Sequence, residues 1–393
     1  MTIIERSGTV RTVSTPGTAM DPTWSHNGRW LAFLVTPTAS QSREASGLAS
    51  LWVASSTTRS LQLIKTPRAT VNAFEWSPKQ PQTLAFSETM PAGSRSSLDI
   101  VDLSSFKTHS LLTAPFITGF QWSPSGHSLA VGTVTYKAHT QSRLVLVSEL
   151  RHTTTTLLHN TSIGYIPASW SPKQNELLYW TDPYFSSSIA ADGLELSGLN
   201  LTSHRSWALG TTLTYSNWIA WSPSGNRVAV VMGGSRTEWD SKRHVDLCQL
   251  ATTRCSPVSL PSHLIGLDPS FSQDGDLIFT AAPGALPDQV APPALGHVIT
   301  PFGVRTVQAW YQSQTLWSLP RSSAKPVELI GNGAHSPTAI EHGLLYVQAD
   351  SLWFRSSLAT TPVLLQRSVG PSRPYRDTYY GYLDWTEQYS WHS

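Results

Sequence analysis

The sequence predicts an all-β fold, a β-propeller of about seven four-stranded antiparallel blades, with six or eight blades as alternatives. Three observations lead to this expectation. A phrase of an aromatic residue followed by serine recurs about every 50 residues, a turn and a short apolar run follow each copy, and no helical periodicity separates the copies. Repeats of this length that encode four short strands are typical of propeller blades.

The aromatic residue of the phrase marks the repeat. Successive copies are 52, 46, 48, 51 and 50 residues apart. The marked positions are Trp24, Trp76, Trp122, Trp170, Trp221 and Phe271. We interpret them as structural wedges between blades, because large aromatic side chains supply much of the burial in such interfaces.

The residues after the aromatic predict a turn and then a buried strand. In Ser123-Pro124-Ser125-Gly126, proline fixes φ and glycine accepts a positive φ. The run Leu129–Val131 that follows is short and apolar. Lys79-Gln80 and Lys173-Gln174 replace the turn residue and glycine, which predicts longer turns in those two repeats.

The repeats define one domain over residues 1–393, with starts near residues 20, 71, 117, 165, 216, 266 and 335. The seventh copy, around Ala339, has lost its tryptophan and lies 68 residues after Phe271. The interval is rich in proline, alanine and glycine over 283–305, which predicts a loop insertion there.

The two ends of the chain suggest how the ring closes. Residues 8–15 precede Trp24 much as residues 63–67 precede Trp76. We therefore expect them to form the fourth strand of a blade whose other strands are C-terminal, since such a blade would remove open sheet edges. Residues 368–393 are then a C-terminal extension or a ring-closing strand.

The repeated phrase Trp-Ser-Pro-x-Gly, followed by Leu-Ala-Val or Leu-Ala-aromatic, resembles the WD-like repeat of bacterial TolB-type propellers. Similar blades form the propeller of prolyl-oligopeptidase-like peptidases. The resemblance covers roughly residues 8–367. It implies a propeller that binds a protein partner, although this fold serves many tasks.

Composition limits the classes of partner. The net charge is +2 and only 13% of residues are charged, which argues against a nucleic-acid binder. No apolar run is long enough to span a membrane. The N-terminus lacks a signal-peptide core, which taken literally indicates the cytoplasm. The sequence carries no signal for or against oligomerisation.

The two cysteines, Cys248 and Cys255, flank a predicted hairpin turn at positions that face each other across the strands. They are either a disulfide, which favours an oxidising compartment, or two separate thiols. The sequence leaves both the pairing and the compartment open.

No catalytic constellation stands out. A Gly-x-Ser-x-Gly nucleophile elbow is absent, and no glycine-rich phosphate loop precedes a helix. The 13 histidines are dispersed, so they define no metal site. We expect no catalytic residues, no metal and no cofactor, while the question of catalysis stays open.

Candidate binding residues lie in long connections between the second and third strands of blades, at the face where propellers commonly bind. Aromatic and charged side chains on a rigid scaffold dominate binding interfaces. The candidates are Tyr136, Lys137, Tyr184, Phe185, Arg236, Glu238 and Trp239.

Two hypotheses of function follow. The first is a non-catalytic scaffold that binds a protein or peptide through these loops. The second is a propeller that acts on a glycan or small molecule, either as a lectin-like binder or as a hydrolase or lyase with a site in the channel, because aromatic side chains can stack on sugars.

Overall fold

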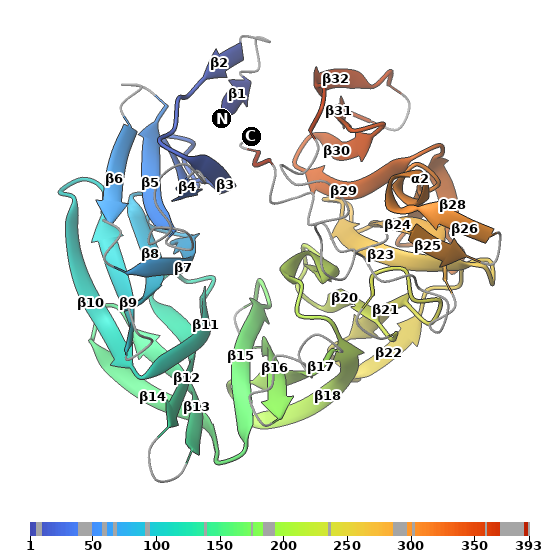
Figure 1. Ribbon diagram of the computed structural model, residues 1–393. Helices are drawn as coiled ribbons and strands as arrows, with labels where there is room; N and C mark the ends of the chain where they lie inside the picture. Colours follow the sequence, from blue (N-terminus) through green and yellow to red (C-terminus); the bar gives the residue numbers. More distant parts are fainter. Residues whose placement is uncertain are drawn as a thin grey trace.

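Seven four-stranded antiparallel sheets form a ring in the computed structural model, which confirms the predicted β-propeller and its seven blades (Figure 1). The structure describes residues 1–4, 10–37, 49–56, 61–65, 69–90, 95–136, 140–173, 176–183, 193–234, 237–285, 297–300, 303–357, 360–369 and 389–391. In every blade the strands pair in chain order, so each sheet is built from one stretch of sequence.

The first four blades cover the N-terminal half of the ring. Blade one contains β3 (Thr18–Trp24), β4 (Trp30–Thr36), β5 (Ser50–Ser55) and β6 (Leu61–Lys65). Blade two contains β7 (Thr70–Trp76), β8 (Thr83–Thr89), β9 (Ser96–Asp102) and β10 (Lys107–Ala114). Blade three contains β11 (Phe116–Trp122), β12 (Ser128–Tyr136), β13 (Thr140–Ser148) and β14 (Thr153–Asn160). Blade four contains β15 (Ile163–Trp170), β16 (Glu176–Pro183), β17 (Leu194–Asn200) and β18 (Arg205–Thr212).

The last three blades complete the ring. Blade five contains β19 (Ile219–Trp221), β20 (Arg227–Met232), β21 (His244–Gln249) and β22 (Arg254–Pro257), after the 3-10 turn η2 (Ser216–Trp218). Blade six contains β23 (Leu264–Phe271), β24 (Leu277–Pro283), β27 (Thr315–Leu319) and β28 (Val327–Ile330). Blade seven contains β29 (Ala334–Ile340), β30 (Gly343–Gln348), β31 (Ser351–Arg355) and β32 (Val363–Gln366).

Two short hairpins lie outside the blades. The chain between β24 and β27 forms the hairpin of β25 (His297–Thr300) and β26 (Gly303–Thr306), and then the short helix α2 (Val307–Tyr311). In the part of the chain that the structure describes, no helix has the length and apolar content needed to cross a membrane.

The N-terminal hairpin corrects the expected ring closure. β2 (Val10–Thr12) pairs with β1 (Thr2–Ile4) in a separate two-stranded sheet rather than with a C-terminal blade. The pairing extends through Val13, whose amide nitrogen lies 2.8 Å from the Met1 carbonyl oxygen. Closing a short local loop costs less chain entropy than pairing strands from opposite ends of the sequence, which accounts for the local hairpin. Residues 370–388 lie outside the described residues.

The repeated tryptophans link neighbouring blades. In four of the five, the indole Nε1 donates across a seam to the residue that precedes the aromatic position of the previous blade. The bonds are Trp76 to the Thr23 carbonyl (2.9 Å), Trp122 to the Glu75 carbonyl (3.2 Å), Trp170 to the Gln121 carbonyl (3.2 Å) and Trp221 to the Ser169 hydroxyl (2.9 Å). Phe271 has no such donor, and the guanidinium of Arg227 lies over its ring at 5.4 Å instead.

The serine after each aromatic residue organises the turn. Ser25 Oγ accepts the amide of Trp30 at 3.0 Å, and Ser222 Oγ accepts that of Arg227 at 3.1 Å. In blade two the Ser77 amide bonds to the Thr83 carbonyl, one residue further along than in blades one, three and five, so the longer turn predicted there is confirmed.

The turn of blade four differs from its prediction. The Ser171 amide bonds to the Glu176 carbonyl, five residues on, which is the spacing that joins Ser222 to Arg227 in blade five. The prediction of a longer turn in blade four is therefore wrong.

Cys248 and Cys255 are directly opposed in the pairing of β21 with β22, and their sulfur atoms form a disulfide. The bond joins the third and fourth strands of blade five. Cys248 is buried, so this end of the hairpin is anchored in the blade interior.

Candidate functional site

The predicted binding face is defined by strand direction. Because successive strands are antiparallel, the connection from second to third strand emerges at the same end of a blade as the connection to the next blade. In blades five and six these are residues 233–243, between β20 and β21, and residues 258–263, between β22 and β23.

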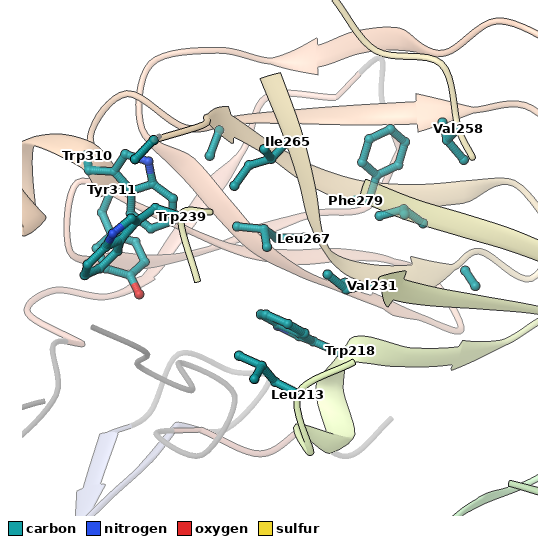
Figure 2. Close-up of a cluster of buried hydrophobic side chains, with 14 of the residues drawn as sticks. Leu213, Trp218, Val231, Trp239, Val258, Ile265, Leu267, Phe279, Trp310 and Tyr311 are labelled. Carbon is teal, nitrogen blue, oxygen red and sulfur yellow. The ribbon is translucent and has the colours of Figure 1, made fainter. Parts of the chain in front are cut away.

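The first of these connections contains a buried segment. Trp239 is fully buried and lies edge-on to Trp310, with ring centroids 5.8 Å apart (Figure 2). Glu238 is 2% exposed, and its Oε2 accepts a hydrogen bond of 2.9 Å from the hydroxyl of Tyr311. Both side chains belong to the core between blades five and six, which corrects the expectation that they contact a partner.

Pairing with blade six explains the burial. The Ala285 amide donates to the Trp239 carbonyl at 2.7 Å, and the Ser241 amide donates to the Ala285 carbonyl at 2.7 Å. Asp240 and Ala285 form a parallel bridge. The segment was predicted to be an exposed loop, but it pairs as a strand does. Its pairing partner lies about 45 residues away in the sequence, so local sequence patterns could not reveal it.

Arg243 fastens the end of the same connection to its beginning. Its Nε donates to the Thr237 carbonyl at 2.9 Å, and its Nη1 to the Gly233 carbonyl at 2.6 Å. The guanidinium lies 4.7 Å from the ring centroid of Trp218. Burial lowers the pKa of Arg243 to about 10, and the charge of Asp240 opposes that shift, so the side chain stays cationic at neutral pH.

The remaining candidate residues are described in part or not at all. Tyr136 is the last residue of β12, and its backbone pairs with Thr140. Lys137, Tyr184, Phe185 and Arg236 lie outside the described residues. Their role in binding stays a prediction.

An open pocket of about 280 Å³ lies between the two connections. Val258 is buried and Leu260 and Leu264 are half-buried, and they supply the apolar part of a lining that is mostly polar. The exposed residues at the rim are Ser241, Lys242, Ser259, Pro261 and Ser262. Sequence patterns did not indicate this pocket, because its two walls come from different blades.

His244 stands at one side of the pocket and is coupled to a carboxylate. Its Nδ1 lies 2.9 Å from the Lys242 carbonyl oxygen, and its Nε2 lies 3.4 Å from Asp246 Oδ1. Burial raises the pKa of Asp246, and the neighbouring His244 opposes that shift. The pair holds the backbone of Lys242 in place and leaves its ammonium group at the rim.

Glycine is required where this wall turns. Gly233 and Gly234 both have φ of +74°, a conformation that other residues rarely adopt. A side chain on Gly233 would collide with the Lys242 carbonyl oxygen. The backbone that shapes the pocket is therefore closely constrained.

Within the ranges that the structure describes, no group of three or more histidine, cysteine, aspartate or glutamate side chains is arranged to hold a metal ion. The pocket offers a mostly polar lining with three apolar side chains and the cationic Lys242 at its rim.

No protein-family model and no curated protein matches this sequence. Among solved structures, it is similar to a prolyl endopeptidase, with a TM-score of 0.56 and 11% identity over 88% of this chain and 49% of that chain. It is similar to the β-propeller domain of the Trilobed protease from Pyrococcus furiosus, with a TM-score of 0.51 and 9% identity over 91% of this chain and 100% of that one. TolB from Acinetobacter baumannii is also similar, with a TM-score of 0.40 and 12% identity over 81% of this chain and 65% of that one.

The chain thus spans about half the length of the prolyl endopeptidase that it matches. At 9 to 12% identity, the likeness concerns the fold. Propeller domains with this architecture occur in proteins of several activities, so function has to be argued from the residues of this chain. What the sequence repeats, the seven sheets and the likeness to the first two of these structures establish together is a seven-bladed β-propeller.

Proposed function

We propose that this chain is a non-catalytic β-propeller scaffold that binds a protein or peptide partner at the pocket between blades five and six. The observation that carries the proposal is the construction of the pocket, in which a few apolar side chains adjoin the exposed Lys242 within a mostly polar lining. Hydrogen bonds hold both walls in place. An apolar anchor beside a polar rim is the usual arrangement of a binding hot spot.

The size of the pocket favours a side chain over a larger ligand. Pockets for drug-sized molecules measure roughly 300–1,000 Å³, and this one lies just below that range. One apolar side chain of a peptide fits such a volume. The Lys242 ammonium then favours an acidic residue next to that apolar side chain.

Rigid walls also favour binding. The pairing of Trp239 and Ser241 with Ala285 is in place before any partner arrives. A preorganised site loses little conformational entropy on binding, so a modest contact area can yield measurable affinity.

The test is affinity selection from a displayed library of short random peptides against the full chain. We expect the selected peptides to combine an apolar residue with a neighbouring Asp or Glu. Lys242→Glu should weaken their binding by about tenfold or more, because it reverses the charge at the rim.

The matched control is Lys325→Glu. Lys325 is an exposed lysine in the connection between the third and fourth strands of blade six, at the opposite face, and its substitution should leave the Kd unchanged. Equal binding to wild type and Lys242→Glu would contradict the proposal. A glycan array that gave Lys242-dependent binding would favour the second hypothesis, a glycan-binding propeller.

A further inference from the structure

The segment Tyr389–Trp391 lies between blade seven and blade one, near β3 and β29 (Figure 1). Ser390 Oγ accepts a hydrogen bond of 3.2 Å from the Trp24 amide in blade one. The Tyr389 hydroxyl donates to the Ser336 carbonyl in blade seven at 3.3 Å. One short segment therefore bonds to both sides of the seam.

Ser390 supplies a hydrogen-bond acceptor that, at other seams, comes from the preceding blade. The Trp122 amide of blade three bonds to Glu75 Oε2 of blade two at 2.9 Å. The Ala339 amide of blade seven bonds to Ser270 Oγ of blade six at 2.9 Å. In each case the acceptor directly precedes the aromatic position of its own blade. At the last seam, Ser390 supplies the acceptor for the Trp24 amide.

The residue of blade seven that corresponds to Glu75 and Ser270 is Thr338. Its Oγ1 lies 3.4 Å from the Tyr389 hydroxyl. The segment thus lies between Thr338 of blade seven and Trp24 of blade one and bonds to both blades. We call the place that the segment occupies the groove between blades seven and one.

A distortion in β29 forms the socket for Tyr389. The pairing of β29 with β30 shifts register between His335 and Thr338, and Ser336 has a φ of +50°. The Ser336 carbonyl is therefore outside the regular ladder and accepts the Tyr389 hydroxyl. The Ser336 amide is held from blade six by Thr280 Oγ1 at 3.0 Å, which fixes the socket.

Trp391 fits less well than its two neighbours. Its ring stacks on Phe354 of β31, with centroids 5.8 Å apart and planes 15° apart. Its Nε1 is buried, and among the described residues it has no hydrogen-bond partner. A buried donor without a partner is unfavourable, so a residue with an aromatic ring and no N–H would occupy this place at lower cost.

We propose that the groove between blades seven and one is a second peptide-binding site, which Tyr389–Trp391 occupies in cis and a partner protein can occupy in trans. The partner presents an aromatic residue, then serine or threonine, then phenylalanine. Phenylalanine has no N–H to bury, so such a partner is favoured over a second copy of the chain, which would bring the same Trp391. The site is separate from the pocket between blades five and six.

The test uses the full chain carrying Trp391→Ala and two labelled peptides. One peptide has the sequence of residues 387–392, and the other has phenylalanine in place of the tryptophan. In wild type the attached segment competes at a high effective concentration. Both peptides should therefore bind the Trp391→Ala protein at least about tenfold more tightly than wild type, as measured by fluorescence anisotropy. The phenylalanine peptide should bind about fivefold more tightly than the native one.

Controls separate this site from non-specific binding. A scrambled peptide and a peptide with alanine in place of the tyrosine should bind weakly, and Phe354→Ala in the protein should weaken binding of the intact peptide. Near-ultraviolet circular dichroism checks the fold. If Trp391→Ala does not fold, Ser390→Ala in the full chain provides the same comparison.

Three outcomes would overturn the proposal. They are equal peptide binding by wild type and variant, equal binding of the scrambled peptide, and a concentration-dependent dimer that the native peptide dissociates. The last result would identify a second copy as the occupant. Because Lys242→Glu leaves this groove intact, failure here is distinguishable from failure of the pocket between blades five and six.

Discussion

The indole Nε1 of Trp76 in blade two donates a hydrogen bond of 2.9 Å to the carbonyl oxygen of Thr23 in blade one. Thr23 directly precedes Trp24, the aromatic marker of its own repeat. The same pairing of positions recurs at the next two seams. The repeated tryptophan is thus both a packing wedge and a hydrogen-bond donor between blades, and its donor role can be tested separately.

Trp76→Phe keeps an aromatic ring and removes the donor. We expect a loss of about 0.5–1.5 kcal/mol in the free energy of unfolding, because the hydrogen bond between the two blades is lost. Trp76→Ala should cost more, about 3–5 kcal/mol, since it also leaves a cavity. Urea denaturation measures both.

The matched control for this substitution is Trp52→Phe. The indole of Trp52 bonds to Ser50 Oγ within its own strand, so no contact between blades is lost. Hydrogen exchange at β3 should rise in Trp76→Phe and not in the control. Unchanged stability of Trp76→Phe would show that packing alone holds this seam.

Glu75 makes stability depend on pH. Burial raises its pKa to about 8, although the bond from the Trp122 amide favours the charged form. The folded chain then keeps this proton up to about pH 8, whereas the unfolded chain releases it near pH 4.5. The contribution of Glu75 to the free energy of unfolding is therefore complete below pH 4.5 and is lost as the pH rises through 8.

Glu75→Gln should remove that dependence and retain an acceptor for the Trp122 amide. We expect the variant to gain stability relative to wild type between pH 5 and pH 8.5, as thermal denaturation at several pH values would show. The exposed Glu328→Gln is the control and should leave the profile unchanged. A profile for Glu75→Gln that parallels wild type would refute the assignment.

The disulfide between Cys248 and Cys255 closes a short loop, with a sequence separation of 7. In the chain-entropy account, a loop of this length contributes about 2–3 kcal/mol. Dithiothreitol should therefore lower the denaturation midpoint of the wild type. The double variant Cys248→Ser/Cys255→Ser should start lower and not respond to the reductant. An unchanged denaturation midpoint of the wild type in dithiothreitol would contradict this expectation.

Gly233→Ala should damage the wall of the pocket between blades five and six. The positive φ and the collision with the Lys242 carbonyl predict a loss of about 1–3 kcal/mol in stability. Binding of selected acidic peptides should weaken as well, because Lys242 moves. Gly331→Ala is the control, since an added side chain there meets only the flexible end of Glu328. Calorimetry and anisotropy report the two effects.

Local patterns were sufficient for the repeat. Trp122, its turn at Gly126 and the apolar run from Leu129 lie within ten residues of one another, and strand and turn preferences act over that distance. The number of these repeats also indicated seven sheets. The turn at Lys79-Gln80 was correctly predicted to be longer, because one additional residue is visible in the sequence itself.

Contacts between distant segments were beyond those patterns. Trp239 and Glu238 resemble exposed loop residues when only their neighbours are considered. They are core residues because Ala285 pairs with Asp240, the next residue in the chain, and holds their segment against blade six. Residues 8–15 resemble a fourth strand, but the described part, Val10–Thr12, pairs with Thr2–Ile4. In both cases the choice of pairing partner decided the outcome.

The sequence by itself determined the blade, its repetition and the identity of the aromatic wedges, because each depends on periodicity and turn chemistry within one repeat. Only the tertiary structure decided which loops are buried, where the pocket lies and what fills the last seam. Those features arise where two blades meet, and burial at such an interface depends on side chains that are far apart in the chain and adjacent in space.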